Sequence, residues 1–518
     1  MKLIFSWNWL LGPVLFLESL DIYMKRHVLA AALAVLFAGA AAYAQEPAGS
    51  PEGGISPEML ARISEGYEGT ASDKAIRNAL AGTSIATLAI NSENAAMIDT
   101  HFSDRVKTEG ITDQKSSGRC WLFTGLNVLR AKMIDEYELP GMEFSQNYLF
   151  FYDQLEKSNL FLQGVIDTRD LPFDDRKVDW LFSNPLSDGG QFTGVSNLIV
   201  KYGLVPSDAM PETFQSENTS QMAMLLKLKL REYGLELRSA YEEGKKDVGK
   251  RPKKDVEAGM LALYERLYDI KVAQLSEIYR MLVLCLGEPV KEFEWARYDR
   301  EGKLVSRKTY TPKSFYDEYI GEDLENNYVM IMNDPCREYG KVYEIDYDRH
   351  VYDGHNWLYV NLPVERIKEM AIASIKDDVA MYFSCDVGKF YSRSKGVLDI
   401  ANFDYASLMG VEFGMDKKER VQTHASGSSH AMTLIAVDIK DGKLAKNLSV
   451  IGQNTKRLLN LVSQLLDFQK IGADKLSPNY EIVNVSDLLT ETVTRFEPTF
   501  IHNRKILTVE KFEENIMA

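Results

Sequence analysis

The residues of this sequence that most clearly suggest chemistry are Gln114 and Cys120, six positions apart in the run ITDQKSSGRCWLFTGLNVLR. Cys120 begins an apolar pattern that continues through Leu126 and Leu129 at helical spacing, which predicts that its thiol lies in the first turn of a buried helix. A helix N-terminus and a neighbouring imidazolium lower the pKa of a thiol, and the resulting thiolate attacks amide carbonyls. Gln114 falls on the preceding loop, where its side-chain amide and the Cys120 backbone N–H can both donate to a developing oxyanion. On these residues alone, a core cysteine beside Trp121 is the competing interpretation.

The Gln-x5-Cys-Trp pattern, with a glycine before the predicted helix, resembles the nucleophile motif of papain-like cysteine peptidases, most closely their bleomycin hydrolase and aminopeptidase C branch. The resemblance covers about residues 70–445. It implies that Cys120 is the nucleophile, that Gln114 is an oxyanion donor, and that N-terminal residues of peptide substrates are hydrolysed by thiol acyl transfer. Further segments resemble the same branch in the same order: FSQNYLFFYDQLEKSN from Phe144, NPLSDGGQF from Asn184, VKYGLVPSDAMPE from Val200, IYRMLVLCLGEP from Ile278, KSFYDEYIG from Lys313, DVGKFYSRSKGVLD from Asp386, GVEFGMDKKER from Gly410 and SSHAMTLIAVDI from Ser428.

A cysteine nucleophile needs an imidazole as its general base, and His430 is the candidate. It precedes an apolar run from Ala431 to Val437, and the sequence SHAMT around it resembles the histidine motif of the family. His27 falls in the predicted leader and His502 in the tail. The remaining histidines are interpreted as surface or structural residues: His101, His350, His355 and His424. No pair of histidines has metal-ligand spacing, so the sequence predicts neither a metal nor a cofactor.

A second glycine-containing segment, Asp188-Gly189-Gly190-Gln191, resembles the family loop along which substrate backbone runs in an extended form. Glycines suit such close approach because they have no side chain. Gly189 and Gly190 are therefore predicted to contact substrate, although a plain turn uses the same residue types.

The composition is that of a globular protein long enough for several domains and a large core, with 518 residues of which 45% are hydrophobic. A formal net charge of -15 disfavours nonspecific binding to nucleic acid.

The order of elements predicts an α+β protein, and it matches the two-lobed papain-like fold that the resemblance implies, in which the active site lies in the cleft between the lobes. Residues 70–215 form a helical lobe with the nucleophile, 216–327 a helical insertion, and 328–446 a strand-rich lobe with His430. The resemblance implies that the insertion helps to build a homo-hexamer. Its basic stretch GKKDVGKRPKKD is interpreted as a solvated loop between helices, with a substrate or partner contact as the alternative. Strands are expected in the runs YVMIM, NWLYVNL, VAMYFSC and HAMTLIAV.

Residues 1–44 are predicted to be a leader, with translation starting at Met24 and a signal peptide over residues 24–44 that is cleaved after Ala44. Its apolar stretch is shorter than the ~20 residues that a membrane span needs, so no stable span is expected after cleavage. If both apolar stretches of the leader were retained, they could instead tether the protein. Residues 45–69 are predicted to be a flexible lead-in. These features predict export by a bacterium to the periplasm or the extracellular space.

Export would expose the cysteines to an oxidising compartment, yet none is predicted to form a disulfide. Secreted papain-like enzymes carry a cysteine three residues before the nucleophile, where this chain has Ser117. The four cysteines are Cys120, Cys285, Cys336 and Cys385.

The resemblance stops after residue 445, before the Asn-Ser-Trp-Gly sequence with which papain-like enzymes orient the catalytic histidine. Residues 447–518 instead resemble a dimerisation helix and the start of the ATP-binding domain of a hybrid two-component sensor histidine kinase. That fragment lacks a phosphoacceptor histidine and a nucleotide-binding core. The C-terminal strands are thus predicted to be replaced by a foreign helical segment, with Asn447 and Asn454 as weak substitutes for the missing asparagine.

Three functional hypotheses follow from these residues. The first is a cysteine-type aminopeptidase whose activity is impaired by loss of the C-terminal segment. The second is a catalytically silent binding or assembly module derived from such a peptidase. The third, and least favoured, is a signalling kinase fragment.

Overall fold

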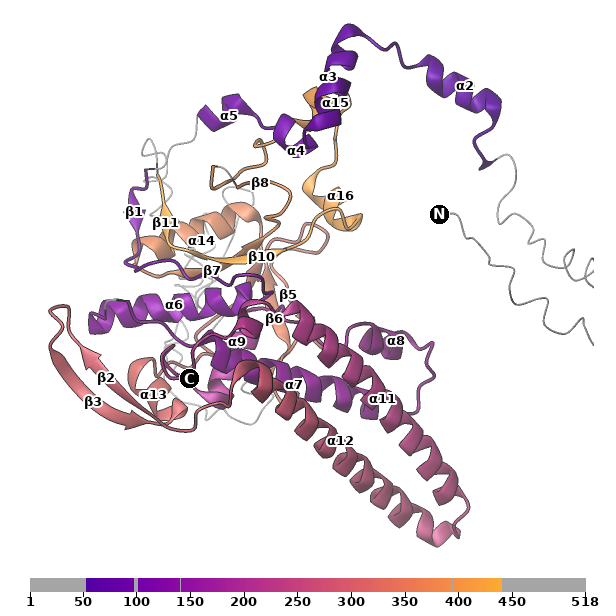
Figure 1. Ribbon diagram of the computed structural model, residues 1–518, viewed down its shortest axis with the longest axis vertical. Coiled ribbons are helices and arrows are strands. Elements are labelled where there is room, and N and C mark those ends of the chain that lie inside the picture. The colour runs from indigo at the N-terminus through magenta and orange to yellow at the C-terminus, as the bar shows by residue number, and fades with distance from the viewer. Residues whose placement is uncertain (1–52, 97–100, 140, 394, 440–518) are drawn as a thin grey trace, which may run out of the picture. The chain divides into compact units, whose positions relative to one another are not determined.

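The computed structural model describes residues 53–96, 101–139, 141–393 and 395–439 (Figure 1). The predicted leader and the kinase-like tail, with Asn447 and Asn454, lie outside the described residues. The chain divides into two compact units, residues 1–88 and 89–518. In the part that the structure describes, no helix is both long and apolar enough to cross a bilayer.

The described part of the first unit consists of three helices: α2 (Pro57–Glu65), α3 (Ala71–Gly82) and α4 (Ile85–Leu88). Helix α2 lies inside the segment predicted as a flexible lead-in. It forms because the Ser56 side chain accepts a hydrogen bond from the Met59 backbone N–H and because proline occupies the first helical position. None of its residues is buried, so the helix is stabilised by this capping and not by core packing.

The main helical core of the second unit forms where its long helices pack together. The longest are α6 (Cys120–Tyr137), α7 (Gln146–Asp167), α11 (Ser220–Gly249) and α12 (Val256–Leu286), and α9 (Phe192–Tyr202) packs on both α6 and α7. Trp121, Phe150 and Phe151 are among the completely buried side chains there. The shorter helices in the described part of the second unit are α5 (Ser92–Ala96), α8 (Arg176–Ser183), α10 (Phe214–Glu217), the 3-10 turn η3 (Lys253–Asp255), α13 (Pro312–Tyr319), α14 (Val364–Lys376), α15 (Tyr405–Met409) and α16 (Lys417–Gln422).

The strands of the second unit form small sheets. Strand β7 (Met381–Cys385) pairs antiparallel with β10 (His430–Leu434), with His430 opposite Cys385. The other pairings are β1 (Asp104–Arg105) with β11 (Ala436–Val437), β2 (Phe293–Tyr298) with β3 (Leu304–Tyr310), β8 (Tyr391–Ser392) with β9 (Val397–Leu398), and the three-stranded order β4 (Ile331–Met332), β6 (Trp357–Asn361), β5 (Val342–Ile345). The four apolar runs predicted as strands contain β4, β6, β7 and β10–β11, so that prediction is confirmed.

The insertion is only partly helical, which differs from the prediction. Helices α11 and α12 form a long antiparallel hairpin (Figure 1). Residues 293–310 of the same segment, however, form the β2–β3 hairpin. The basic stretch is also less of a loop than expected, because α11 continues to Gly249 and α12 begins at Val256. The overall class, a mixture of helices and strands, is α+β as predicted.

Candidate active site

Cys120 is the first residue of α6, as the apolar spacing predicted. The helix begins there because the backbone N–H groups of Leu122 and Phe123 both donate to the Arg119 carbonyl, at 2.9 and 3.1 Å. Trp121 is completely buried whereas Cys120 is only partly buried, and its thiol is free. The helix therefore holds the thiol at the N-terminus of α6, the positive end of the helix dipole.

Cys120, His430 and Gln114 line one pocket with a volume of about 310 Å³. Its walls are the segment 108–112, one side of α6 and the start of β10. Helix α6 packs on β10, and the Thr433 hydroxyl donates to the Thr124 carbonyl at 3.4 Å. Residues that are 310 positions apart (430 minus 120) are thus brought together by the packing of this helix on this strand.

His430 has a fixed backbone and a weakly supported ring. Its backbone belongs to the β7–β10 ladder. Burial lowers the pKa of its imidazole below the ordinary histidine value. No hydrogen bond joins the ring to any residue of the described ranges, which end at residue 439. The neutral imidazole is therefore favoured, and nothing in this part of the chain selects its tautomer or its rotation.

Gln114 is held by a reciprocal pair of hydrogen bonds within its own loop. Its Nε2 donates to the Ser117 carbonyl at 2.6 Å, and the Ser117 hydroxyl donates to the Gln114 carbonyl at 2.6 Å. The second hydrogen on Nε2 remains for another acceptor. The loop thus presets the side-chain amide beside the pocket.

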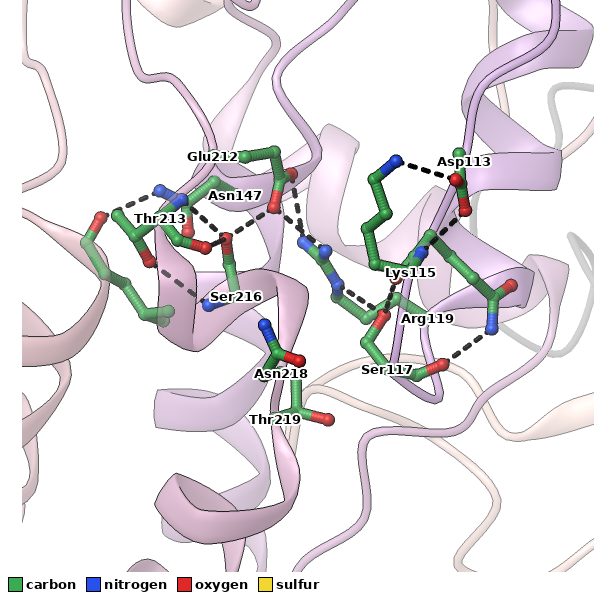
Figure 2. Close-up of polar contacts among 12 residues, drawn as sticks. Asp113, Lys115, Ser117, Arg119, Asn147, Glu212, Thr213, Ser216, Asn218 and Thr219 are labelled. Atoms are coloured by element: carbon green, nitrogen blue, oxygen red, sulfur yellow. Dashed lines mark hydrogen bonds and ion pairs between the residues drawn. The ribbon is translucent and has the colours of Figure 1, made fainter.

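The residue before the nucleophile is anchored by an ion pair between the buried Arg119 and the partly buried Glu212, which Figure 2 shows. The Arg119 guanidinium contacts both carboxylate oxygens of Glu212, with N–O distances of 2.9 and 3.0 Å, and its Nε donates to the Ser117 hydroxyl at 3.1 Å. The same guanidinium lies 5.0 Å from the centre of the Phe123 ring and 5.1 Å from that of Phe150. Because Arg119 is completely buried, its ion pair with Glu212 fixes the start of α6.

Gly189 and Gly190 lie on a loop that is tied to the nucleophile helix. The Trp121 indole N–H donates to the Asp188 carbonyl at 2.8 Å, and the Lys157 ammonium donates to the Gly189 carbonyl at 2.6 Å. A β-carbon on Gly190 would lie only 2.2 Å from His350 Cε1 and 2.9 Å from Trp121 Cδ2. At Gly189 the nearest atom would be the Ser187 hydroxyl at 3.3 Å. Gly190 is therefore required by packing beneath the loop, a reason that the sequence did not reveal.

A buried polar cluster lies under this loop and was missed by the sequence analysis. His350 Nδ1 lies 2.6 Å from Asp153 Oδ1, and the Lys157 ammonium lies 3.0 Å from Asp153 Oδ2. Burial and the Lys157 cation both lower the pKa of His350. Asp153 acts to raise it but does not outweigh them. Burial acts to raise the pKa of Asp153, but Lys157 and His350 outweigh it and hold that pKa below its ordinary value. His350, interpreted as a surface or structural residue, is thus a structural residue packed against the Trp121 ring at 4.5 Å.

Tyr382 on β7 is a further neighbour of the site that the sequence analysis did not single out. Its hydroxyl is buried and has no hydrogen-bond partner in the described residues. Burial raises the pKa of Tyr382 well above its ordinary range, and the proximity of Cys120 adds to the rise. Nothing in its spacing along the chain signals this position. No group of residues able to hold a metal ion occurs in the described ranges.

A cysteine at the start of a buried helix, a histidine at the start of a strand and a glutamine on the loop before the cysteine, all lining one pocket, define the papain-like class of cysteine peptidases. The sequence matches the Peptidase C1-like family over residues 54–451, and the chain belongs to this family. The match begins at residue 54, within the predicted lead-in. This protein is accordingly a cysteine-type peptidase.

Known relatives extend over most of this chain. The aminopeptidase C of Lactobacillus delbrueckii subsp. lactis is 38% identical over 351 residues, which are 67% of this chain and 74% of that protein. The human (Homo sapiens) bleomycin hydrolase is 36% identical over 349 residues, covering 66% of this chain and 73% of the relative. A crystal structure of PepW from Lactobacillus rhamnosis HN001 superposes with a TM-score of 0.68 at 33% identity, covering 76% of this chain and 84% of that one.

Proposed function

We propose that this peptidase is an aminopeptidase that removes N-terminal residues from peptides through an acyl-enzyme on Cys120. The observation that carries the proposal is the pocket shared by Cys120, His430 and Gln114. The 38% sequence identity to a protein named aminopeptidase C supports cleavage at the N-terminal end of peptide substrates.

The arrangement can perform thiol acyl transfer in two halves. His430 takes the proton of Cys120, and the thiolate attacks the substrate carbonyl carbon. The oxyanion accepts hydrogen bonds from the Cys120 backbone N–H and from the remaining N–H of Gln114. The imidazolium then gives its proton to the leaving amine nitrogen as the C–N bond breaks. Water, deprotonated by His430, hydrolyses the thioester and releases the carboxylic acid and the thiol.

Hydrolysis of aminoacyl p-nitroanilides by the purified chain tests this function. Cys120→Ala is expected to lower kcat/KM by about 10³-fold or more, because it removes the nucleophile. Cys336→Ser, which changes a loop cysteine outside the pocket, is the matched control and should retain wild-type turnover. Equal turnover by Cys120→Ala and the wild-type chain would contradict the assignment.

A catalytically silent binding or assembly module is the second candidate, and it is favoured because the His430 ring has no hydrogen-bond partner among the residues that the structure describes. An imidazole without an orienting group supports thiolate formation poorly. Alkylation by an active-site-directed probe separates the two candidates. A working site reacts faster at Cys120 than free cysteine does, whereas a silent module reacts no faster.

We further propose that the protein is exported and that it self-associates as a homo-hexamer. The leader sequence supports export to the periplasm or the extracellular space, and N-terminal sequencing of the mature protein tests cleavage after Ala44. Exposed apolar side chains on α11 and α12 support self-association, because such surface normally contacts another molecule. They include Met224, Leu225, Leu228, Leu235, Leu261 and Tyr268.

A further inference from the structure

The side chain of Asp188 joins the loop before the nucleophile to the start of α11. Its Oδ2 accepts a hydrogen bond from the Gly118 backbone N–H at 2.7 Å and another from the Thr219 hydroxyl at 2.6 Å. Its own carbonyl accepts from the Trp121 indole at 2.8 Å. One residue of the glycine loop thus contacts the chain on both sides of Cys120.

The contact with Gly118 is close enough to depend on glycine. A β-carbon at position 118 would lie 2.3 Å from Asp188 Oδ1 and 2.6 Å from Cγ. No real β-carbon tolerates such distances, so the carboxylate occupies the space that a side chain would need. The neighbouring Ser116 N–H also donates to the Glu217 carbonyl at 2.9 Å, so the nucleophile loop is attached to the same segment twice.

The attached loop carries both predicted oxyanion donors. Gln114 depends on it through the hydrogen bond from its Nε2 to the Ser117 carbonyl, one residue before Gly118. The Cys120 backbone N–H follows two residues after Gly118. A displacement of Gly118 therefore moves the two donors relative to the substrate loop that contains Gly189 and Gly190.

We propose that Asp188 is a positioning residue of the peptidase, which holds the oxyanion donors of Gln114 and Cys120 in register with the substrate loop. It acts through Gly118 and Trp121 and does not touch the reacting atoms. The carboxylate of Asp188 supplies a noncovalent link between the two loops. The catalytic consequence rests on the proposed function, whereas the link itself does not.

Amide hydrogen exchange tests the link without requiring activity. In the wild-type chain the Gly118 N–H is expected to be protected in the fragment that contains residues 114–121. Asp188→Ala should remove that protection, whereas Asp188→Asn should retain it because its carbonyl oxygen can accept the same hydrogen bonds. Protection that persists in Asp188→Ala, while the rest of the chain remains folded, would overturn the proposal.

Kinetics on the full-length chain tests the consequence. Asp188→Ala is expected to lower kcat for aminoacyl p-nitroanilides about 100-fold, because misplaced oxyanion donors cost that much, with KM changed by less than about threefold. Its alkylation by iodoacetamide, which forms no oxyanion, should stay within about threefold of wild type. Asp188→Asn should restore most of kcat.

The matched control is Asp175→Ala, since Asp175 also accepts hydrogen bonds from backbone N–H groups, at the start of α8. It should lower thermal stability without changing kcat. Equal losses of hydrolysis and alkylation in Asp188→Ala would mean a general structural role and would contradict the proposal. If the wild-type chain hydrolyses nothing, the proposed function fails, and the exchange measurement alone decides whether the link exists.

Discussion

The imidazole of His430 enters the pocket from the first position of β10, with its pKa lowered by burial and without a partner in the described residues. Cys120 is better supported, because it is the first residue of a helix whose position is fixed by core packing. At the residue scale the two halves of the catalytic pair are therefore unequal. The thiol is fixed by its helix, whereas no hydrogen bond from the described residues orients the base.

The lowered pKa of His430 predicts the pH dependence of hydrolysis. Neutral imidazole is the base, and a lowered pKa keeps it neutral to more acidic pH. We expect the acidic limb of the kcat/KM profile to have its midpoint below the ordinary histidine value of about 6.5. The profile is measured with an aminoacyl p-nitroanilide, and His355→Ala, which changes an exposed histidine, should leave it unmoved. A midpoint above that value would contradict the pKa direction.

Gly189 has more space around it than Gly190, so replacement by alanine should affect the two positions differently. Gly190→Ala should lower the free energy of unfolding by about 1–3 kcal/mol, because its β-carbon would overlap His350 and Trp121. Gly189→Ala should leave stability nearly unchanged and act on KM, if substrate backbone runs along this loop. Thermal denaturation and steady-state kinetics of both variants measure the difference. Comparable stability of the two variants would show that the packing beneath Gly190 is not needed.

At the scale of elements, α6 is the piece that organises the site. Its first residue is the nucleophile, the Arg119–Glu212 pair fixes its start, and β10 packs along its side. Its buried face is nearly continuous, so the helix cannot rotate without exposing core residues. The position of the thiol is thus a consequence of core packing.

The Arg119–Glu212 ion pair before α6 predicts that replacing one carboxylate by an amide lowers the free energy of unfolding strongly. Glu212→Gln leaves the Arg119 charge buried without its partner, and we expect a loss of about 3 kcal/mol in the free energy of unfolding. Glu294→Gln is the control, since it breaks an exposed pair with Arg307 that is worth at most about 1 kcal/mol. Urea denaturation of both variants tests the contrast. Similar small losses would mean that Arg119 finds another partner.

The sequence predicted the elements of the site better than the contacts between them. The start of α6 at Cys120 and the strand after His430 were visible because apolar periodicity and the family resemblance are local signals. The link from Asp188 to Gly118 spans 70 residues, and no local pattern encodes such a pair. The β2–β3 hairpin was missed for a related reason, since its strands are mostly exposed and lie within a segment rich in helix formers.

At the scale of the whole molecule, the α11–α12 hairpin has exposed apolar side chains on both helices. Leu228 is 64% exposed and Leu261 is 61% exposed, which is costly for a helix that faces only water. The hairpin core itself is well packed, because Leu226, Leu230 and Leu267 are buried. Its outer face is therefore available for contact between copies of the chain.

We expect substitution on this outer face to change the oligomeric state. Leu228→Glu combined with Leu261→Glu should shift a hexamer to smaller species, since it places charges in an apolar interface. Ile400→Glu changes an apolar residue outside the hairpin that is even more exposed, and it serves as the control. Size-exclusion chromatography with light scattering measures the mass. A wild-type chain that elutes only as a monomer would contradict the proposed assembly.

The close contact between Gly118 and the Asp188 carboxylate also constrains how this sequence can diverge. A chain that keeps aspartate at 188 accepts alanine at 118 only if the carboxylate shifts away from the Gly118 N–H, and a chain that first loses the aspartate gains room for a side chain there. The two positions should therefore drift together across lineages, in a fixed order of substitution. In directed evolution that starts from this gene, a side chain at position 118 should therefore be accepted more readily after a change at position 188.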